Sequence, residues 1–85
     1  MRVARIHIWA TEEQWKNVTR LTRLGVAYSE PEMGRQAGFT KGEWRDFYGR
    51  LRAVGALVPR GNGPRAGYDP APWWLKTLQQ RPWER

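Results

Sequence analysis

The sequence predicts a small α+β domain that is mostly helical, and three observations lead to this prediction. Three segments begin with a capping box, in which Ser or Thr is followed three residues later by Glu or Gln. One of these segments repeats aromatic and aliphatic residues at helical spacing. A glycine-rich stretch between two short apolar runs indicates a β-hairpin. The 85 residues suffice for one core, so we expect a single domain over residues 1–85.

The first ten residues are expected to form a strand or an extended arm. Apolar and polar side chains partly alternate there, which would place Ile6 and Ile8 on one face of a strand. The first helix then begins at Thr11, whose hydroxyl forms a capping box with the side chain of Gln14. This helix is expected to end at Gly25. Its inward-facing residues are expected to be Trp15, Val18, Leu21 and Thr22.

A second, short helix is expected to follow. Ser29 and Glu32 form the next capping box, and Pro31 falls in the first turn, where its missing amide hydrogen is not needed. Gly38 is expected to end this helix, because glycine readily adopts the left-handed conformation that closes a helix.

The longest expected helix covers residues 41–54. Its capping box is formed by Thr40 and Glu43. Side chains that recur at i, i+3, i+4, i+7 and i+10 predict a stripe facing the core, and these are Trp44, Phe47, Tyr48, Leu51 and Val54. Gly55 is expected to close the helix.

A β-hairpin and a last helix complete the expected elements. A strand at residues 56–58 is followed by a loop in which Asn62 and Gly63 can both adopt positive φ and so favour a tight turn. Tyr68 and Asp69 would form the returning strand, and residues 73–78 the last helix. The chain thus divides into an N-terminal strand or arm (1–10), a core (11–69, with the hairpin at about 56–69) and a C-terminal helical extension (70–85).

Residues 31–68 run in the order helix, tight turn, helix, strand, basic loop, strand. In this order the chain resembles the winged helix-turn-helix family of DNA-binding domains, with three core helices and the hairpin as the wing. The residues that carry the resemblance are Met33, Ala37, Gly38, Trp44, Phe47, Tyr48, Leu51, Leu57, Val58 and the loop to Tyr68. Residues 37–57 are also distantly similar to the winged domain that orients bacterial chromosome translocases. The resemblance covers about half of the chain and supports a fold more than a role.

The resemblance implies that the helix at residues 41–54 enters the major groove of double-stranded DNA and that the wing lies along a minor groove. Arg45 could contact two acceptors of guanine. Gly42 and Gly49 would let the helix backbone approach the DNA closely. The expected DNA-binding residues are Lys41, Arg45 and Arg52 on the helix and Arg60, Asn62 and Arg65 on the wing.

Other interpretations of these basic surfaces remain open. The outer helix face could contact a protein, or it could be a solvated face on which Asp46 and Arg50 form an i, i+4 ion pair. The wing arginines could serve only to keep an exposed hairpin soluble. Fifteen Lys and Arg against eight Asp and Glu give a net charge of +7, which favours a polyanionic partner. A basic surface that only aids solubility, or the arginine bias of a GC-rich genome, would give the same balance.

Six tryptophans are an unusually high number for a chain of this length. Trp15 and Trp44 fall on the inward stripes. Trp73 and Trp74 are adjacent and cannot both point inward from one helix, so one is expected to cover the core and the other to meet a partner. Trp73, Trp74 and Trp83 are therefore candidates for an interface with a second copy or another protein. A homodimer would match the symmetry of a palindromic DNA site.

The sequence offers little for catalysis or cofactor binding. His7 is the only histidine, Ser29 is the only serine, and cysteine is absent, so neither a nucleophile–base pair nor a metal site is indicated. No apolar run approaches the roughly 20 residues that cross a bilayer, and we expect a cytoplasmic protein without cofactor or small-molecule substrate. The leading hypothesis is a small basic DNA-binding protein, acting as a transcriptional regulator or architectural factor for phage, plasmid or chromosome transactions. The alternative is a winged-helix protein-interaction module that docks through surface tryptophans.

Overall fold

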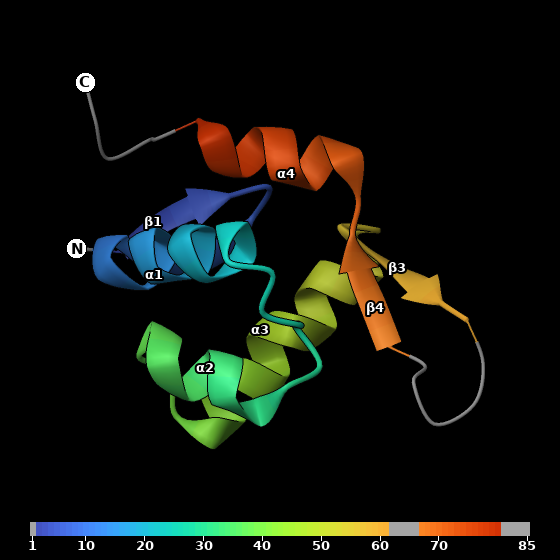
Figure 1. Cartoon of the computed structure of the whole chain (residues 1–85). Helices are drawn as coiled ribbons and strands as arrows, with labels where there is room; N and C mark the ends of the chain where they lie inside the picture. The colour runs from blue at the N-terminus through green and yellow to red at the C-terminus, as the bar shows by residue number, and fades with distance from the viewer. Residues whose placement is uncertain (1, 62–66, 81–85) are drawn as a thin grey trace.

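The computed structural model describes residues 2–61 and 67–80, which form a mostly helical α+β fold (Figure 1). Their elements are β1 (Arg2–Arg5), β2 (Ile8–Thr11), α1 (Glu12–Arg23), α2 (Pro31–Ala37), α3 (Lys41–Ala53), β3 (Leu57–Arg60), β4 (Gly67–Pro70) and α4 (Pro72–Gln79). The strands form two separate antiparallel pairs, β1 with β2 and β3 with β4. The predicted fold class is confirmed at this level. In Figure 1, α1 lies between α4 and α2, and the β3–β4 hairpin projects beyond the end of α3.

The N-terminus forms a hairpin, so the expectation of one strand or an arm was wrong. Strand β1 turns at Ile6 and His7, which both have positive φ (49° and 65°), and β2 pairs back with Arg5 opposite Ile8. Non-glycine residues rarely adopt this conformation, and a β-branched residue such as Ile does so at a cost. No turn signal in the sequence marked this position. Ile8 is therefore buried, whereas Ile6 sits in the turn and is 39% exposed.

The helix starts follow the predicted capping boxes in two of three cases. The hydroxyls of Thr11 and Thr40 accept hydrogen bonds from backbone amides three residues later, at 3.0 and 3.2 Å. The predicted box at Ser29 was wrong, because α2 begins one residue later, with Glu30 as its N-cap and no side-chain hydrogen bond. Pro31 occupies the first turn as predicted, and Gly38 ends α2 with a φ of 91°.

Helices α2 and α3 pack tightly against each other at Gly34. A Cβ atom placed on Gly34 would lie 2.3 Å from Cγ of Trp44, so any side chain there would displace the indole. On the other side Tyr28 stacks on Trp44, with ring centroids 6.2 Å apart. The indole therefore fixes the position of α3 against α2 and against the connection that precedes α2.

The core is a cluster of aromatic rings drawn from several elements. Trp15 of α1 contacts Phe47 of α3 edge-on at 5.4 Å between centroids and Trp74 of α4 at 6.0 Å. The predicted α3 stripe is buried at Trp44, Phe47 and Leu51 and half-buried at Tyr48. Val54, predicted to face inward, is 44% exposed, because α3 ends at Ala53 and the chain turns away there.

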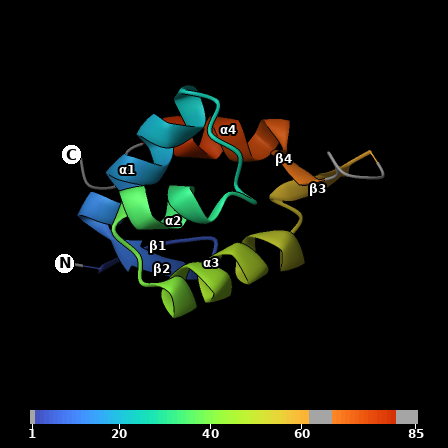
Figure 2. The same ribbon diagram turned by 60° about the horizontal axis from the view of Figure 1, so that its bottom comes forward.

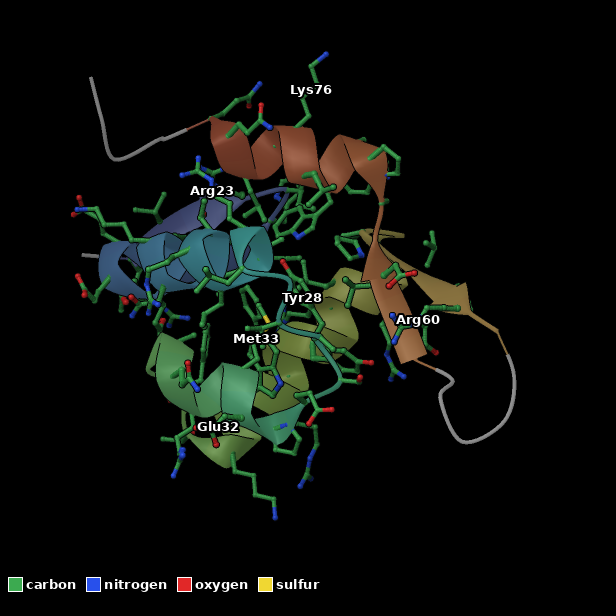
Figure 3. All side chains as sticks on the ribbon, in the orientation of Figure 1. Arg23, Tyr28, Glu32, Met33, Arg60 and Lys76 are labelled. Carbon is green, nitrogen blue, oxygen red and sulfur yellow. The ribbon has the colours of Figure 1, made fainter. Side chains whose placement is uncertain are left out.

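Helix α4 is part of the core and not only an extension of it. Trp74 is fully buried, and its Nε1–H donates a hydrogen bond of 3.0 Å to the hydroxyl of Tyr28. The same hydroxyl lies 2.6 Å from Oγ1 of Thr22 on α1. Figure 3 shows Tyr28 pointing into the centre of the molecule between these helices. One phenol oxygen thus connects α1, α4 and the α1–α2 connection.

The second hairpin contains the predicted strands. Strand β3 begins one residue later than predicted and continues to Arg60, and β4 extends the predicted strand by one residue at each end. Leu57 pairs with Pro70 and Arg60 with Gly67. Ala71, just after β4, donates a backbone hydrogen bond of 2.8 Å to the carbonyl of Ala56, which ties the start of α4 to the start of β3. The turn predicted at Asn62 and Gly63 lies outside the described residues.

The Gly34 contact leads to a prediction about stability. Gly34→Ala is expected to destabilise the fold by about 1–3 kcal/mol, because the new methyl group overpacks against Trp44. Gly49→Ala in α3 is the matched control, since a Cβ there meets no atom within 4 Å. This control is expected to stabilise the protein by about 0.5–1 kcal/mol through the better helix propensity of alanine. Urea unfolding of both variants measures the difference, and a shift of the same sign in both would contradict the packing argument.

A second prediction concerns Tyr28. Tyr28→Phe leaves the buried Nε1–H of Trp74 without its acceptor and is expected to cost about 1–3 kcal/mol at pH 7. Burial raises the pKa of Tyr28, so its neutral form is favoured in the folded state. This contribution to stability is fully present below the unfolded tyrosine pKa of about 10 and is lost as the pH rises through the folded pKa. The stability gap between wild type and variant should therefore narrow above pH 10, and a constant gap in denaturant titrations would refute the assignment.

Candidate nucleic-acid interface

The side of α3 that faces away from the core carries exposed cations. Lys41, Arg45 and Arg52 are all exposed. They stand at i, i+4 and i+11, and Tyr48 completes the same line at i+7, so these four residues share one face of the helix. We call Lys41, Arg45, Tyr48 and Arg52 the basic stripe. In the turned view of Figure 2, α3 itself runs toward the β3–β4 hairpin, so the stripe extends in that direction.

Small residues lie beside the basic stripe on the outer face of α3. A Cβ atom built on Gly42 or Gly49 would meet no atom within 4 Å, so the space outside both positions is open. Ala53 continues this line and is exposed. No other part of the described chain covers the helix backbone here, and the C-terminal helix α4 lies on the far side of α1 (Figure 1).

Four cations outside the basic stripe form ion pairs with carboxylates among the described residues. Ion pairs join Lys16 to Glu12 at 3.3 Å, Arg50 to Asp46 at 3.0 Å, Arg60 to Asp69 at 3.1 Å, and Arg35 to Glu32. In residues 2–61 and 67–80, no carboxylate pairs with the cations of the basic stripe. The stripe therefore presents positive charge that this part of the chain does not compensate.

Arg52 is held in place by two aromatic rings. Its guanidinium carbon lies 5.1 Å from the ring centroid of Tyr48 and 5.4 Å from that of Tyr68 in β4. The two phenol rings meet edge-on at 5.9 Å. A guanidinium that contacts aromatic rings does not use its five N–H donors in that contact. The Arg52 side chain forms no hydrogen bond with another described residue, so its N–H donors can serve a ligand.

The Tyr48–Arg52–Tyr68 cluster also joins α3 to the hairpin. Sequence reasoning assigned Tyr48 to the core and gave Tyr68 only a place in the returning strand. The i, i+4 spacing of Tyr48 and Arg52 is the sequence signal that could have indicated the stacking. Burial raises the pKa of Tyr48, although Arg52 acts in the opposite direction, so the phenol stays neutral at physiological pH.

Of the three hairpin residues expected to contact DNA, the structure describes one, Arg60. Arg60 is exposed on β3, as Figure 3 shows, and forms an ion pair across the hairpin with Asp69. This pairing lowers the net charge that Arg60 can offer to a phosphate. Asn62 and Arg65 lie outside the described residues.

The opposite flank of α3 has a different character. Glu43, Asp46 and Arg50 line a pocket of about 280 Å³ with residues of the N-terminal hairpin, among them Arg2 and the exposed Trp9. Two carboxylates and two guanidinium groups balance one another in charge there. The two flanks of α3 are thus distinct, one cationic and next to the β3–β4 hairpin, the other mixed in charge and next to β1–β2.

The tryptophans expected at a partner interface separate into three cases. Trp74 is fully buried in the core, so its assignment to a partner interface was wrong. Its adjacent neighbour Trp73 is 43% exposed, as expected for one of the two. Trp83 lies outside the described residues. The described part of the chain contains no group of three or more His, Cys, Asp or Glu side chains that could hold a metal ion.

None of the helices in residues 2–61 and 67–80 has the length and apolar character that a bilayer crossing requires.

Comparison with known proteins gives no family to which the chain can be assigned. No protein-family model, no curated protein sequence and no solved structure matches it.

Proposed function

We propose that this chain is a small winged-helix protein that binds double-stranded DNA through α3. The observation that carries the proposal is the basic stripe, in which Lys41, Arg45 and Arg52 are exposed on one face of a helix and lack carboxylate partners among the described residues. Uncompensated Arg and Lys on one face of a domain are the electrostatic footprint of a nucleic-acid partner. The net charge of +7 supports the same class of ligand.

The order of elements supports a winged helix-turn-helix topology. Helices α2 and α3 are joined by a short turn, and the β3–β4 hairpin follows α3 directly, in the position of a wing. In this arrangement α3 lies in the major groove, with its N-terminal half nearest the base edges. Arg45 donates to guanine, and the open space at Gly42 and Gly49 lets the backbone come close to the bases.

The charge difference between the flanks of α3 orients the helix on DNA. The flank with the basic stripe faces a phosphate strand, because its cations form no ion pair within the described residues. The flank with Glu43 and Asp46 faces away from phosphates, since carboxylates there would repel them. Arg52 contacts a phosphate at the end of the stripe next to the wing, and Arg60, Asn62 and Arg65 extend the contact toward the minor groove.

The role that fits this module is a transcriptional regulator or an architectural factor acting on phage, plasmid or chromosomal DNA in the bacterial cytoplasm. A homodimer would suit a palindromic site, because its two-fold symmetry matches that of the DNA. No enzymatic step, cofactor or small-molecule substrate is part of the proposal.

Duplex titrations test the proposal with three variants. Arg45→Ala is expected to weaken binding to the preferred duplex by about 1–3 kcal/mol, as for the loss of a bidentate guanine contact. Arg52→Ala is expected to weaken binding to all duplexes and to lower the slope of log K against log salt by about 1, as for one lost phosphate contact. The preferred duplex is obtained first by selection from a random pool.

Lys76→Ala is the matched control, because it also removes one positive charge but lies on the outward face of α4 (Figure 3). It is expected to leave affinity and salt slope unchanged. Absence of duplex binding at about 50 mM salt, where phosphate contacts are strong, would end the proposal. Equal losses in Arg52→Ala and Lys76→Ala would show that net charge alone, and not α3, attracts the DNA.

A further inference from the structure

A second surface lies between α1 and α4. The two helices run antiparallel, and α1 lies between α4 and α2 (Figure 1). The groove contains a pocket of about 130 Å³ lined by Thr19, Thr22, Arg23, Leu75, Leu78 and Gln79. Pockets for small organic ligands usually measure about 300–1,000 Å³. This one is therefore suited to a single side chain of a larger partner.

The walls of this groove offer an apolar surface. The hydroxyl of Thr19 donates to the carbonyl of Trp15 at 2.8 Å, and that of Thr22 donates to the carbonyl of Val18 at 2.6 Å. Both hydroxyl donors are thus used within α1 and are not left for a ligand. Leu75 on α4 lines the same pocket and is 39% exposed, so an apolar side chain is accessible there.

The rim of the groove is cationic. Arg23 lines the pocket, and Arg20 lies one turn before it on α1; both are exposed. Within the described part of the chain neither arginine forms an ion pair with a carboxylate. Figure 3 shows Arg23 rising from α1 on the side of α4. The groove therefore combines apolar walls with the guanidinium group of Arg23, and Arg20 lies one turn away; neither forms an ion pair within the described residues.

We propose that the α1–α4 groove docks an acidic amphipathic helix of a partner protein. An apolar side chain of that helix enters between Leu75 and Thr22, and carboxylates on the adjacent turns pair with Arg20 and Arg23. This is the helix-in-groove mode of peptide recognition, with charge complementarity setting the choice of partner. The proposal goes beyond DNA binding by α3 and does not depend on it, since the two surfaces share no residue.

The probe for this surface is a synthetic helical peptide with Leu at i, i+3 and i+7 and Glu at the flanking positions. A second peptide carries Lys in place of each Glu. The full chain, labelled with ¹⁵N, is titrated with each peptide and followed by amide chemical shifts. The acidic peptide is expected to cause saturable shifts at α1 and α4, and the lysine peptide none.

Two charge-reversal variants locate the contact. Arg23→Glu is expected to weaken acidic-peptide binding by about tenfold or more, because it places like charges opposite one another. Lys76→Glu makes the same change in net charge on the outward face of α4 and is expected to leave the affinity within about twofold of wild type. Circular dichroism of both variants verifies that they fold.

Each of the other outcomes overturns the proposal. Shifts confined to α3, a lack of saturation, or equal losses in the two variants would mean that the acidic peptide senses only net charge. Shifts at α1 and α4 on titration with duplex DNA would assign the groove to nucleic acid. Sedimentation of the free chain as a dimer, with dimerisation abolished by Arg23→Glu, would assign it to a second copy. None of these results depends on whether α3 binds DNA.

Discussion

The arrangement of the helices depends on the packing of the Trp44 indole against Gly34. Because the indole fills the space that a side chain on α2 would need, the two helices can approach closely at this one point. The contact sets the rotation of α3 about its own axis, and this rotation decides which of its residues reach solvent. With Trp44, Phe47 and Leu51 turned inward, the positions that remain outside are those of the basic stripe and its small neighbours. Packing in the core thus determines what the surface presents.

The carboxylates of the chain contribute to this surface by their placement. Four of them pair with neighbouring cations on α1, α2, α3 and the β3–β4 hairpin, and Glu43 is occupied by the cap of α3, where its pKa is lowered mainly by the backbone hydrogen bond from Thr40. Exposed pairs of this kind add little to stability. Their larger effect is to neutralise these four cations, whereas the cations of the basic stripe on α3, and Arg20 and Arg23 on α1, form no ion pair within the described residues. Both regions of the surface therefore retain positive charge.

Local signals in the sequence were enough to predict most of the helices, while contacts distant in sequence were not predictable. Thr11 and Thr40 cap helices because the hydroxyl and the amide it binds are three residues apart, a relation that is fully contained in the sequence. The turn at Ile6 and His7 has no such signal, since the pairing of β1 with β2 imposes a conformation that these residues disfavour. The burial of Trp74 depends on Tyr28, which lies 46 residues away. For the candidate site, helical spacing predicted that Arg45 lies opposite the buried stripe, with Lys41 and Arg52 at the margin of that face. The contact of Arg52 with Tyr68 of β4 depends on the fold and was not predictable in this way.

The contact of the Arg52 guanidinium with the rings of Tyr48 and Tyr68 has a consequence for the energetics of association. A free arginine side chain samples many rotamers, and ordering it on a ligand opposes binding by roughly 1–2 kcal/mol of conformational entropy. The rings of Tyr48 and Tyr68 restrict that motion while the protein is still alone. Most of the ordering is therefore complete when the chain folds, and the guanidinium reaches its ligand pre-organised.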